Sequence, residues 1–109
     1  MTPEGYDFTG KVAIVTGGGT GIGAATALLL ARYGADLAIA GRTEATLSAT
    51  AQAIERETGR RCIWTRADMR EEEQAEALVA RTVAEFGRVD VLVNNVGWGD
   101  HATLSDTTL

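Results

Sequence analysis

The most constraining feature of this 109-residue chain is a glycine-rich turn that follows a short apolar strand. The residues from Val12 to Thr16 are apolar or β-branched, and five glycines fall between Gly17 and Gly23. A helix-forming stretch begins immediately afterwards. Such a turn brings backbone N–H groups and the positive end of a helix dipole to one point. Because glycine has no Cβ to hold an anion away, a pyrophosphate fits there.

Strand and helix patterns alternate along the chain, which indicates a parallel sheet of βαβ units. The expected strands are Val12–Thr16, Asp36–Ala40, Arg61–Thr65 and Val89–Val93, and the expected helices are about Gly21–Tyr33, Glu44–Thr58 and Glu71–Phe86. Since crossovers are right-handed, we expect a Rossmann-type, doubly wound α/β sheet of order 3-2-1-4, incomplete after the fourth strand. Ligands should then bind beyond the carboxyl ends of the first and fourth strands.

Apolar spacing predicts the buried face of each helix. For the first helix, this face consists of Ile22, Ala25, Leu29 and Leu30. For the second, it consists of Leu47, Ala51 and Ile54. For the third, it consists of Ala75, Leu78, Val79, Thr82, Val83 and Phe86.

Composition argues against several kinds of partner. The net charge is −5 and Lys11 is the only lysine, so no basic patch suits a nucleic-acid backbone. Cys62, expected to be half-buried in a strand, is the only cysteine and His101 the only histidine. This excludes an internal disulfide and any cysteine-cluster or multi-histidine metal site. No apolar run could cross a bilayer or serve as a signal core, so we expect a soluble cytoplasmic protein with no membrane partner.

Three nucleotide-binding folds use related glycine loops, so the loop alone is a weak signal. A P-loop is rejected, because Ala24 and Ala25 stand where its Lys and Ser or Thr would be. A methyltransferase loop is disfavoured but stays open, since Gly41-Arg42-Thr43 after the second strand contains no acid. A glycine turn that binds nothing is the remaining alternative.

The third of these folds, a dinucleotide-binding fold, fits the sequence best. The spacing Thr16-Gly17-x-x-x-Gly21-x-Gly23 resembles the cofactor loop of the short-chain dehydrogenase/reductase family, and Gly19-x-Gly21-x-x-Ala24 satisfies the general dinucleotide fingerprint. Asn94-Asn-Val-Gly97 resembles the Asn-Asn-Ala-Gly segment of that family, with Val96 in place of Ala. The resemblance covers the whole chain, but only about the first half of the family's usual fold. It implies a cofactor-binding set of Gly17, Gly19, Thr20, Gly21, Ile22, Gly23, Arg42, Asp68, Met69, Asn94, Asn95, Val96 and Gly97.

Arg42 governs the choice of cofactor. An acid at this position would bind the ribose 2′-OH and select NAD, whereas an arginine pairs with a 2′-phosphate. A cation just before a helix is also unfavourable unless an anion lies beside it. We therefore expect NADP(H), with a solvated surface arginine as the alternative.

Three members of this set have structural alternatives. Asp68-x-x-Glu71 also has the pattern of a helix N-cap with a capping box. The pair Asn94-Asn95 could simply end the fourth strand. Trp98, Asp100 and His101 follow that pair and are expected to form a surface loop.

The resemblance implies an oxidoreductase that moves hydride between NADP(H) and a small alcohol or carbonyl substrate. In that family a Tyr-x-x-x-Lys pair handles the proton, but here the only tyrosines are Tyr6 and Tyr33, and Lys11 does not lie four positions after either of them. We assign no catalytic residue and expect these residues alone to be inactive, with a homo-oligomer formed by the complete protein. A non-catalytic nucleotide-binding or assembly module is the alternative. We also expect an exposed fourth strand to make the isolated chain marginal or self-associating.

Overall fold

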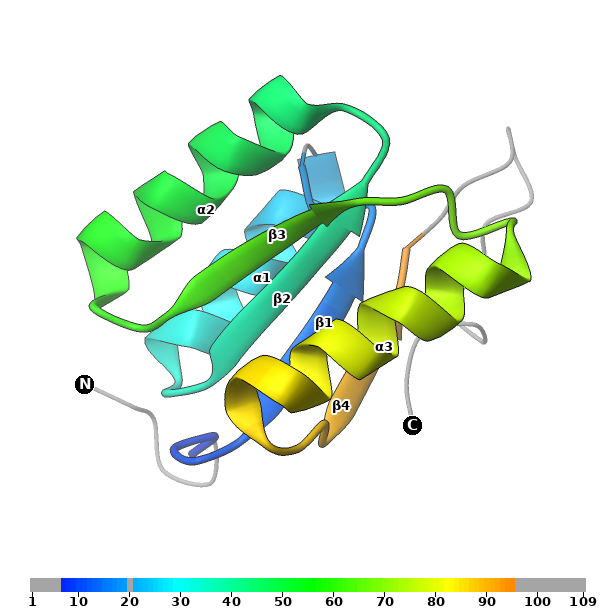
Figure 1. Cartoon of the computed structure of the whole chain (residues 1–109). Coiled ribbons are helices and arrows are strands. Elements are labelled where there is room, and N and C mark those ends of the chain that lie inside the picture. Colours follow the sequence, from blue (N-terminus) through cyan, green and yellow to red (C-terminus); the bar gives the residue numbers. More distant parts are fainter. Residues whose placement is uncertain (1–6, 20, 96–109) are drawn as a thin grey trace.

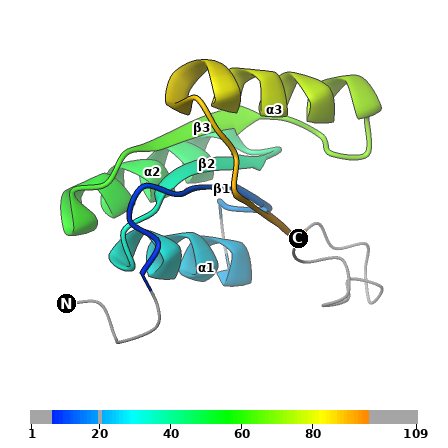
Figure 2. The same ribbon diagram turned by 90° about the horizontal axis from the view of Figure 1, so that it is seen from below.

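A computed structural model describes residues 7–19 and 21–95. Its elements follow in the order β1 (Val12–Thr16), α1 (Gly21–Arg32), β2 (Asp36–Gly41), α2 (Glu44–Thr58), β3 (Cys62–Arg66), α3 (Glu72–Phe86) and β4 (Val91–Asn94). The four strands are parallel in the order β3-β2-β1-β4, as predicted. Helices α1 and α2 cover one face of the sheet and α3 covers the other (Figures 1 and 2). The prediction of a Rossmann-type fold is confirmed.

The element bounds differ from the prediction by one or two residues. Helix α1 ends at Arg32, β2 includes Gly41, β3 runs one residue later than expected, and β4 begins at Val91. Helices α2 and α3 stop where expected, because Gly59 and Gly87 follow them in the left-handed conformation and donate back to the last turn. Such offsets are ordinary at frayed element ends.

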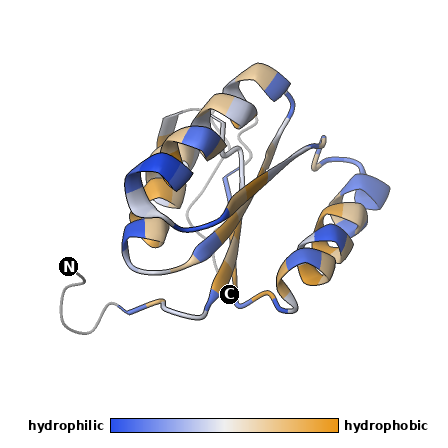
Figure 3. Cartoon of the chain, turned by 60° about the vertical axis from the view of Figure 1, so that its left-hand side comes forward, coloured by the Kyte–Doolittle hydropathy of each residue, from blue (hydrophilic) through white to orange (hydrophobic). Residues whose placement is uncertain are grey.

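The apolar core lies on both faces of the central strands. All five residues of β1 and the four central residues of β2 are buried, which suits strands covered by helices on both sides. The hydropathy colouring shows apolar strands between helices in which apolar and polar residues alternate (Figure 3). Cys62 is 4% exposed and so more buried than expected, and burial and the nearby Glu55 raise the pKa of its thiol to about 12.

The predicted face of α1 is wrong. The helix buries Gly23, Ala27 and Ala31, whereas Ile22 is 75% exposed and Leu29 47% exposed. Large apolar residues suggested one face, but close packing of α1 on the sheet selects the smallest side chains instead. Leu30 is half-buried against the core.

The other two helices follow the prediction to different degrees. Helix α2 buries Leu47, Ala51 and Ile54, as predicted. Helix α3 buries only Leu78 and Thr82 of its predicted set, and Val79 is 44% exposed. Among the described residues, no helix has the length and apolarity needed to cross a membrane.

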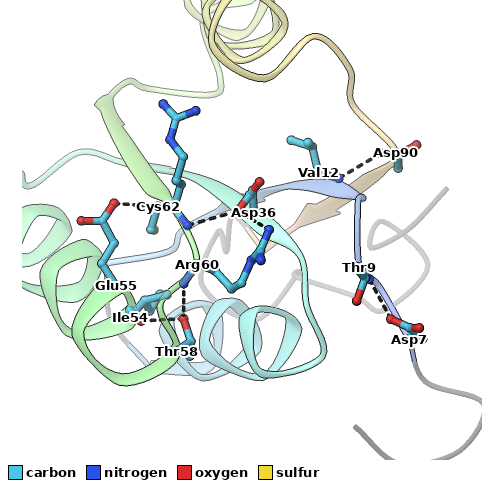
Figure 4. Close-up of polar contacts among 11 residues, drawn as sticks. Asp7, Thr9, Val12, Asp36, Ile54, Glu55, Thr58, Arg60, Cys62 and Asp90 are labelled. Atoms are coloured by element: carbon cyan, nitrogen blue, oxygen red, sulfur yellow. Dashed lines mark hydrogen bonds and ion pairs between the residues drawn. The ribbon is translucent and has the colours of Figure 1, made fainter. Parts of the chain in front are cut away.

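At the amino ends of the strands, carboxylates accept hydrogen bonds from backbone N–H groups (Figure 4). Asp36 at the start of β2 accepts from the backbone N–H of Arg61, and Asp90 accepts from that of Val12. Glu55 accepts from the backbone N–H of Cys62. These bonds occupy strand-end donors at the edge opposite the glycine loop, so Asp36 lies at the wrong end of β2 to bind a ribose.

Candidate nucleotide-binding site

The glycine loop is packed tightly between β1, β2 and the end of β4. A Cβ on Gly17 would lie 2.6 Å from the carbonyl oxygen of Asn95, and one on Gly18 would lie 2.7 Å from Cβ of Ile39. The Gly18 N–H donates to the carbonyl oxygen of Ala40 at 3.0 Å. Only glycine fits at these positions, because side chains would push the loop off the sheet.

Helix α1 begins directly against this loop. A Cβ on Gly23 would run into the carbonyl group of Gly17, with its carbonyl carbon at 2.6 Å. By contrast, nothing lies within 4 Å of a Cβ on Gly21, and Ile22 points to solvent. The first turn of a helix has backbone N–H groups without intrahelical partners, so an open cradle of donors forms at this end.

Helix α2 holds the far side of the loop. The Thr50 hydroxyl donates to the carbonyl oxygen of Gly19 at 2.9 Å, in a partly buried contact. A Cβ on Gly19 would lie 2.7 Å from Oγ1 of Thr46, so α2 also limits the size of the loop residue. The loop is therefore fixed from three sides, by α1, α2 and β4.

Thr16 joins the ends of β1 and β4. Its buried hydroxyl donates to Oδ1 of Asn94 at 2.9 Å and accepts from the backbone N–H of Asn95 at 2.8 Å. The prediction that the glycine loop and the Asn pair share one end of the sheet is confirmed for Asn94 and Asn95. Thr20, Val96, Gly97 and the 98–101 loop residues lie outside the described part of the chain.

Arg42 lies in the exposed turn between β2 and α2. Its carbonyl oxygen accepts from Nε of Arg66 at 3.3 Å, and its own guanidinium makes no ion pair within residues 7–19 and 21–95. The following residue, Thr43, is the N-cap of α2 but makes no side-chain capping bond. Arg42 therefore stands at the positive end of α2, where a cation is unfavourable; Glu44 lies in the first turn of the helix but forms no ion pair with Arg42.

The capping-box hypothesis for Asp68 is wrong. Helix α3 begins at Glu72 with Glu71 as its N-cap, and Asp68 lies outside it. Its carboxylate instead accepts from the Arg70 guanidinium at 2.8 and 3.0 Å and from the Arg70 backbone N–H. Sequence spacing suggested a cap, but the doubly bonded arginine two residues later holds Asp68 in a turn of its own.

Arg70 also sets the charge state of this carboxylate. Its hydrogen bonds, with a smaller contribution from the charge of Arg42, lower the pKa of Asp68 to about 2. Asp68 is therefore an anion at neutral pH and lies within the electrostatic reach of Arg42. Met69 beside it is half-buried and packs against the core cluster of Ile14 and Leu78.

Three residues that hold the site together were missed as site residues in the sequence analysis: Thr16, Thr50 and Arg66. Thr16 was noted only as the first residue of the loop spacing. Neither of the other two belongs to a local motif, because each acts on a loop far away in the sequence. Such contacts can be identified only once the packing of the helices and the register of the strands are known.

The arrangement can hold an anion but contains no described acid–base pair for proton transfer. The N-terminus of α1, Arg42 and the pair Asn94–Asn95 all lie at the carboxyl ends of β1, β2 and β4. This is the place where open parallel sheets bind nucleotides, so it is the candidate site of this fold.

Comparison with known proteins identifies the family. A model of the short chain dehydrogenase family matches residues 11–109. An uncharacterized oxidoreductase of Mycobacterium tuberculosis is 46% identical over 108 residues, covering 99% of this chain and 41% of the relative. A cis-4-hydroxycyclohexanecarboxylate dehydrogenase of Sinomonas cyclohexanicum is 46% identical over 93 residues, covering 85% and 36%. The chain therefore belongs to the short-chain dehydrogenase/reductase family of oxidoreductases.

Solved structures agree with the family assignment. An L-sorbose reductase from Gluconobacter frateurii, determined with NADPH and L-sorbose, superposes with a TM-score of 0.83 at 32% identity, covering 94% of this chain and 39% of the reductase. A citronellol catabolism dehydrogenase of Pseudomonas aeruginosa has a TM-score of 0.79 at 44% identity, covering 84% and 38%. The chain thus spans about two fifths of the length of the relatives it matches.

Proposed function

We propose that this chain is the NADP(H)-binding part of an oxidoreductase that moves hydride between the nicotinamide and a small alcohol or carbonyl substrate. One observation carries the proposal: Gly17 and Gly23 pack the glycine loop and the start of α1 so closely that neither position has room for a Cβ, which brings the first turn of α1, with its unpaired backbone N–H groups, to the carboxyl end of β1. Such an arrangement suits a pyrophosphate, which needs a close approach to the backbone.

Arg42 supports the choice of NADP(H) over NAD(H). The residue after β2 is the one that faces the adenosine ribose in sheets of this type. A guanidinium there pairs with a 2′-phosphate through two parallel N–H bonds, whereas a 2′-OH carries no negative charge to pair with it. That Arg42 has no acidic partner among the described residues leaves it available for such a phosphate.

Each element of the site has a distinct part in this function. The first turn of α1 and the glycine loop bind the pyrophosphate, and Thr50 keeps the loop in place. Asp68 and Met69 border the adenine, while Asn94 and Asn95, fixed by Thr16, border the nicotinamide end. When bound, the nicotinamide supplies the hydride chemistry.

The experiment is a comparison of NADPH and NADH binding by the chain and its Arg42→Ala variant, using isothermal titration calorimetry. Loss of a charge-assisted phosphate contact should weaken NADPH binding about tenfold or more, with NADH changed by about twofold at most. Arg56→Ala, which removes an arginine from the last turn of α2, is the matched control. Equal weakening of both cofactors would show that Arg42 does not select the 2′-phosphate.

Turnover is a separate part of the proposal. The sequence contains no Tyr-x-x-x-Lys pair, so we expect the 109 residues to bind the dinucleotide without reducing carbonyl compounds. NADPH consumption by the purified chain with a panel of aldehydes and ketones would contradict this. The homo-oligomer and the cytoplasmic location expected from the sequence remain predictions.

A further inference from the structure

Most arginines of this chain already pair with a carboxylate. These pairs are Arg32–Glu57, Arg60–Asp36, Arg61–Glu85, Arg70–Asp68 and Arg88–Asp90. Arg42, Arg56, Arg66 and Arg81 form no such pair with a described residue. Of these, Arg42 lies in the turn after β2 and Arg66 is the last residue of β3, so both stand at the carboxyl end of the sheet, where the proposed nucleotide site lies.

The two arginines are linked through the backbone. In the parallel register, Arg66 lies opposite Gly41, the last residue of β2. The N–H of Ala67 donates to the carbonyl oxygen of Gly41 at 2.7 Å, and Nε of Arg66 donates to that of Arg42 at 3.3 Å. The end of β3 therefore holds two successive carbonyl groups of the turn that carries the Arg42 side chain.

The acids nearby do not neutralise this pair. The carboxylate of Asp68 accepts from Nε and Nη2 of Arg70, so its charge is largely matched there. Glu44 in the first turn of α2 makes no ion pair with Arg42 or Arg66. The Nε of Arg66 donates to the Arg42 carbonyl oxygen, whereas its terminal nitrogens form no hydrogen bond or ion pair with a described residue, and the residue is exposed.

We propose that Arg66 is a second determinant of 2′-phosphate specificity, which positions Arg42 through its backbone and adds a second positive charge beside the phosphate. This inference rests on the proposed NADP(H) site and deepens it. A phosphate dianion is matched better by two guanidinium groups than by one, and arginine offers the planar donors that phosphate geometry requires. A ribose 2′-OH gains little from either group, so the effect falls on the phosphorylated cofactor alone.

The test measures four ligands by isothermal titration calorimetry: NADPH, NADH, adenosine 2′,5′-bisphosphate and 5′-AMP. Arg66→Gln should weaken NADPH and the bisphosphate about fivefold, leaving NADH and AMP within about twofold. Arg66→Lys retains the charge but not the Nε bond to Arg42, so its loss should be intermediate. Arg56→Gln removes the same charge at the far end of α2 and should change no ligand by more than about twofold.

Each outcome decides between distinct conclusions. If the unsubstituted chain prefers NADPH and Arg66→Gln removes most of that preference, the inference holds. If the chain prefers NADPH but Arg66→Gln retains the preference, or weakens all four ligands equally, Arg66 has no part in specificity while the proposed function stands. If the chain shows no preference for NADPH, the proposed function fails and the role of Arg66 fails with it. Because Arg66 is exposed, unfolding of the variant is not expected, and circular dichroism at each titration temperature verifies this.

Discussion

The two ends of the parallel sheet use their polar groups in opposite ways. At the amino end, the carboxylates of Asp36, Glu55 and Asp90 accept from strand-end N–H groups (Figure 4), and Asp36 and Asp90 also pair with arginines of the chain itself. At the carboxyl ends of β1 and β2 lie the glycine loop and the exposed Arg42, which forms no ion pair with a described residue. The carboxylates at the first end are matched by contacts within the chain, whereas the proposed function assigns Arg42 at the second end to a ligand.

This contrast separates stability from binding. A substitution at the amino end removes a contact present in the folded chain, so it should lower the free energy of unfolding without altering ligand affinity. A substitution at the carboxyl end should alter affinity first. The predictions below test this separation.

The largest effect is expected from Gly23→Ala. The added methyl group would collide with the carbonyl group of Gly17 and approach the Asn95 side chain at 3.1 Å, so α1 or the loop must shift. We expect a loss of about 3 kcal/mol in the free energy of unfolding, as for other overpacked positions, together with loss of dinucleotide binding. Urea denaturation and calorimetric titration measure the two effects.

Gly41→Ala is the matched control for Gly23→Ala. It adds the same methyl group at the same edge, where the nearest atom is Cδ2 of Leu47 at 3.4 Å. This variant should stay close to the unsubstituted chain in stability. If both variants behave alike, the contact between α1 and the loop is not what requires glycine.

A pair of smaller substitutions compares the two ends directly. Asp36→Ala removes the acceptor of the Arg61 N–H and the ion pair with Arg60, while Thr50→Val removes the donor to the Gly19 carbonyl. Each should cost about 1 kcal/mol in the free energy of unfolding. Only Thr50→Val should also weaken binding, by about threefold for NADPH and NADH alike, since it loosens the pyrophosphate loop. Weakened cofactor binding by Asp36→Ala would show that the amino end of the sheet affects binding as well as stability.

The parts of the structure that the sequence predicted are those set by short-range signals. The glycine loop, the helix stops at Gly59 and Gly87 and the strand order followed from local residue chemistry and from the handedness of crossovers. The placement of Asn94 beside the loop followed as well, because carboxyl ends of parallel strands share an edge.

The parts that were missed depend on long-range packing. The buried face of α1 is chosen by how closely the sheet approaches it, so Ala27 and Ala31 displaced the larger Leu29. The capping box expected at Asp68 does not form, because both of its carboxylate oxygens accept from Arg70. The roles of Thr50 and Arg66 each depend on a partner more than 20 residues away, 31 and 24 positions respectively, and no local pattern encodes such a contact.

The smallest predicted effect concerns the response of the amino end to acid. The Arg88 guanidinium and the Val12 N–H lower the pKa of Asp90 from its usual 3.8. A carboxyl group whose pKa is lower in the folded state stabilises the fold above its unfolded pKa and loses this contribution as pH falls through the folded value. The contribution of Asp90 should thus be intact at pH 5 and decline below pH 3.8.

Asp90→Asn isolates this contribution, because the amide oxygen can still accept from Val12 but carries no charge. Urea denaturation between pH 6 and pH 2 should show a difference in stability between the chain and Asp90→Asn that narrows below pH 3.8. A difference that stays constant over this range would mean that Asp90 is not held as an anion by Arg88. Since Asp90 lies at the amino end of the sheet, NADPH affinity at neutral pH should not change in this variant.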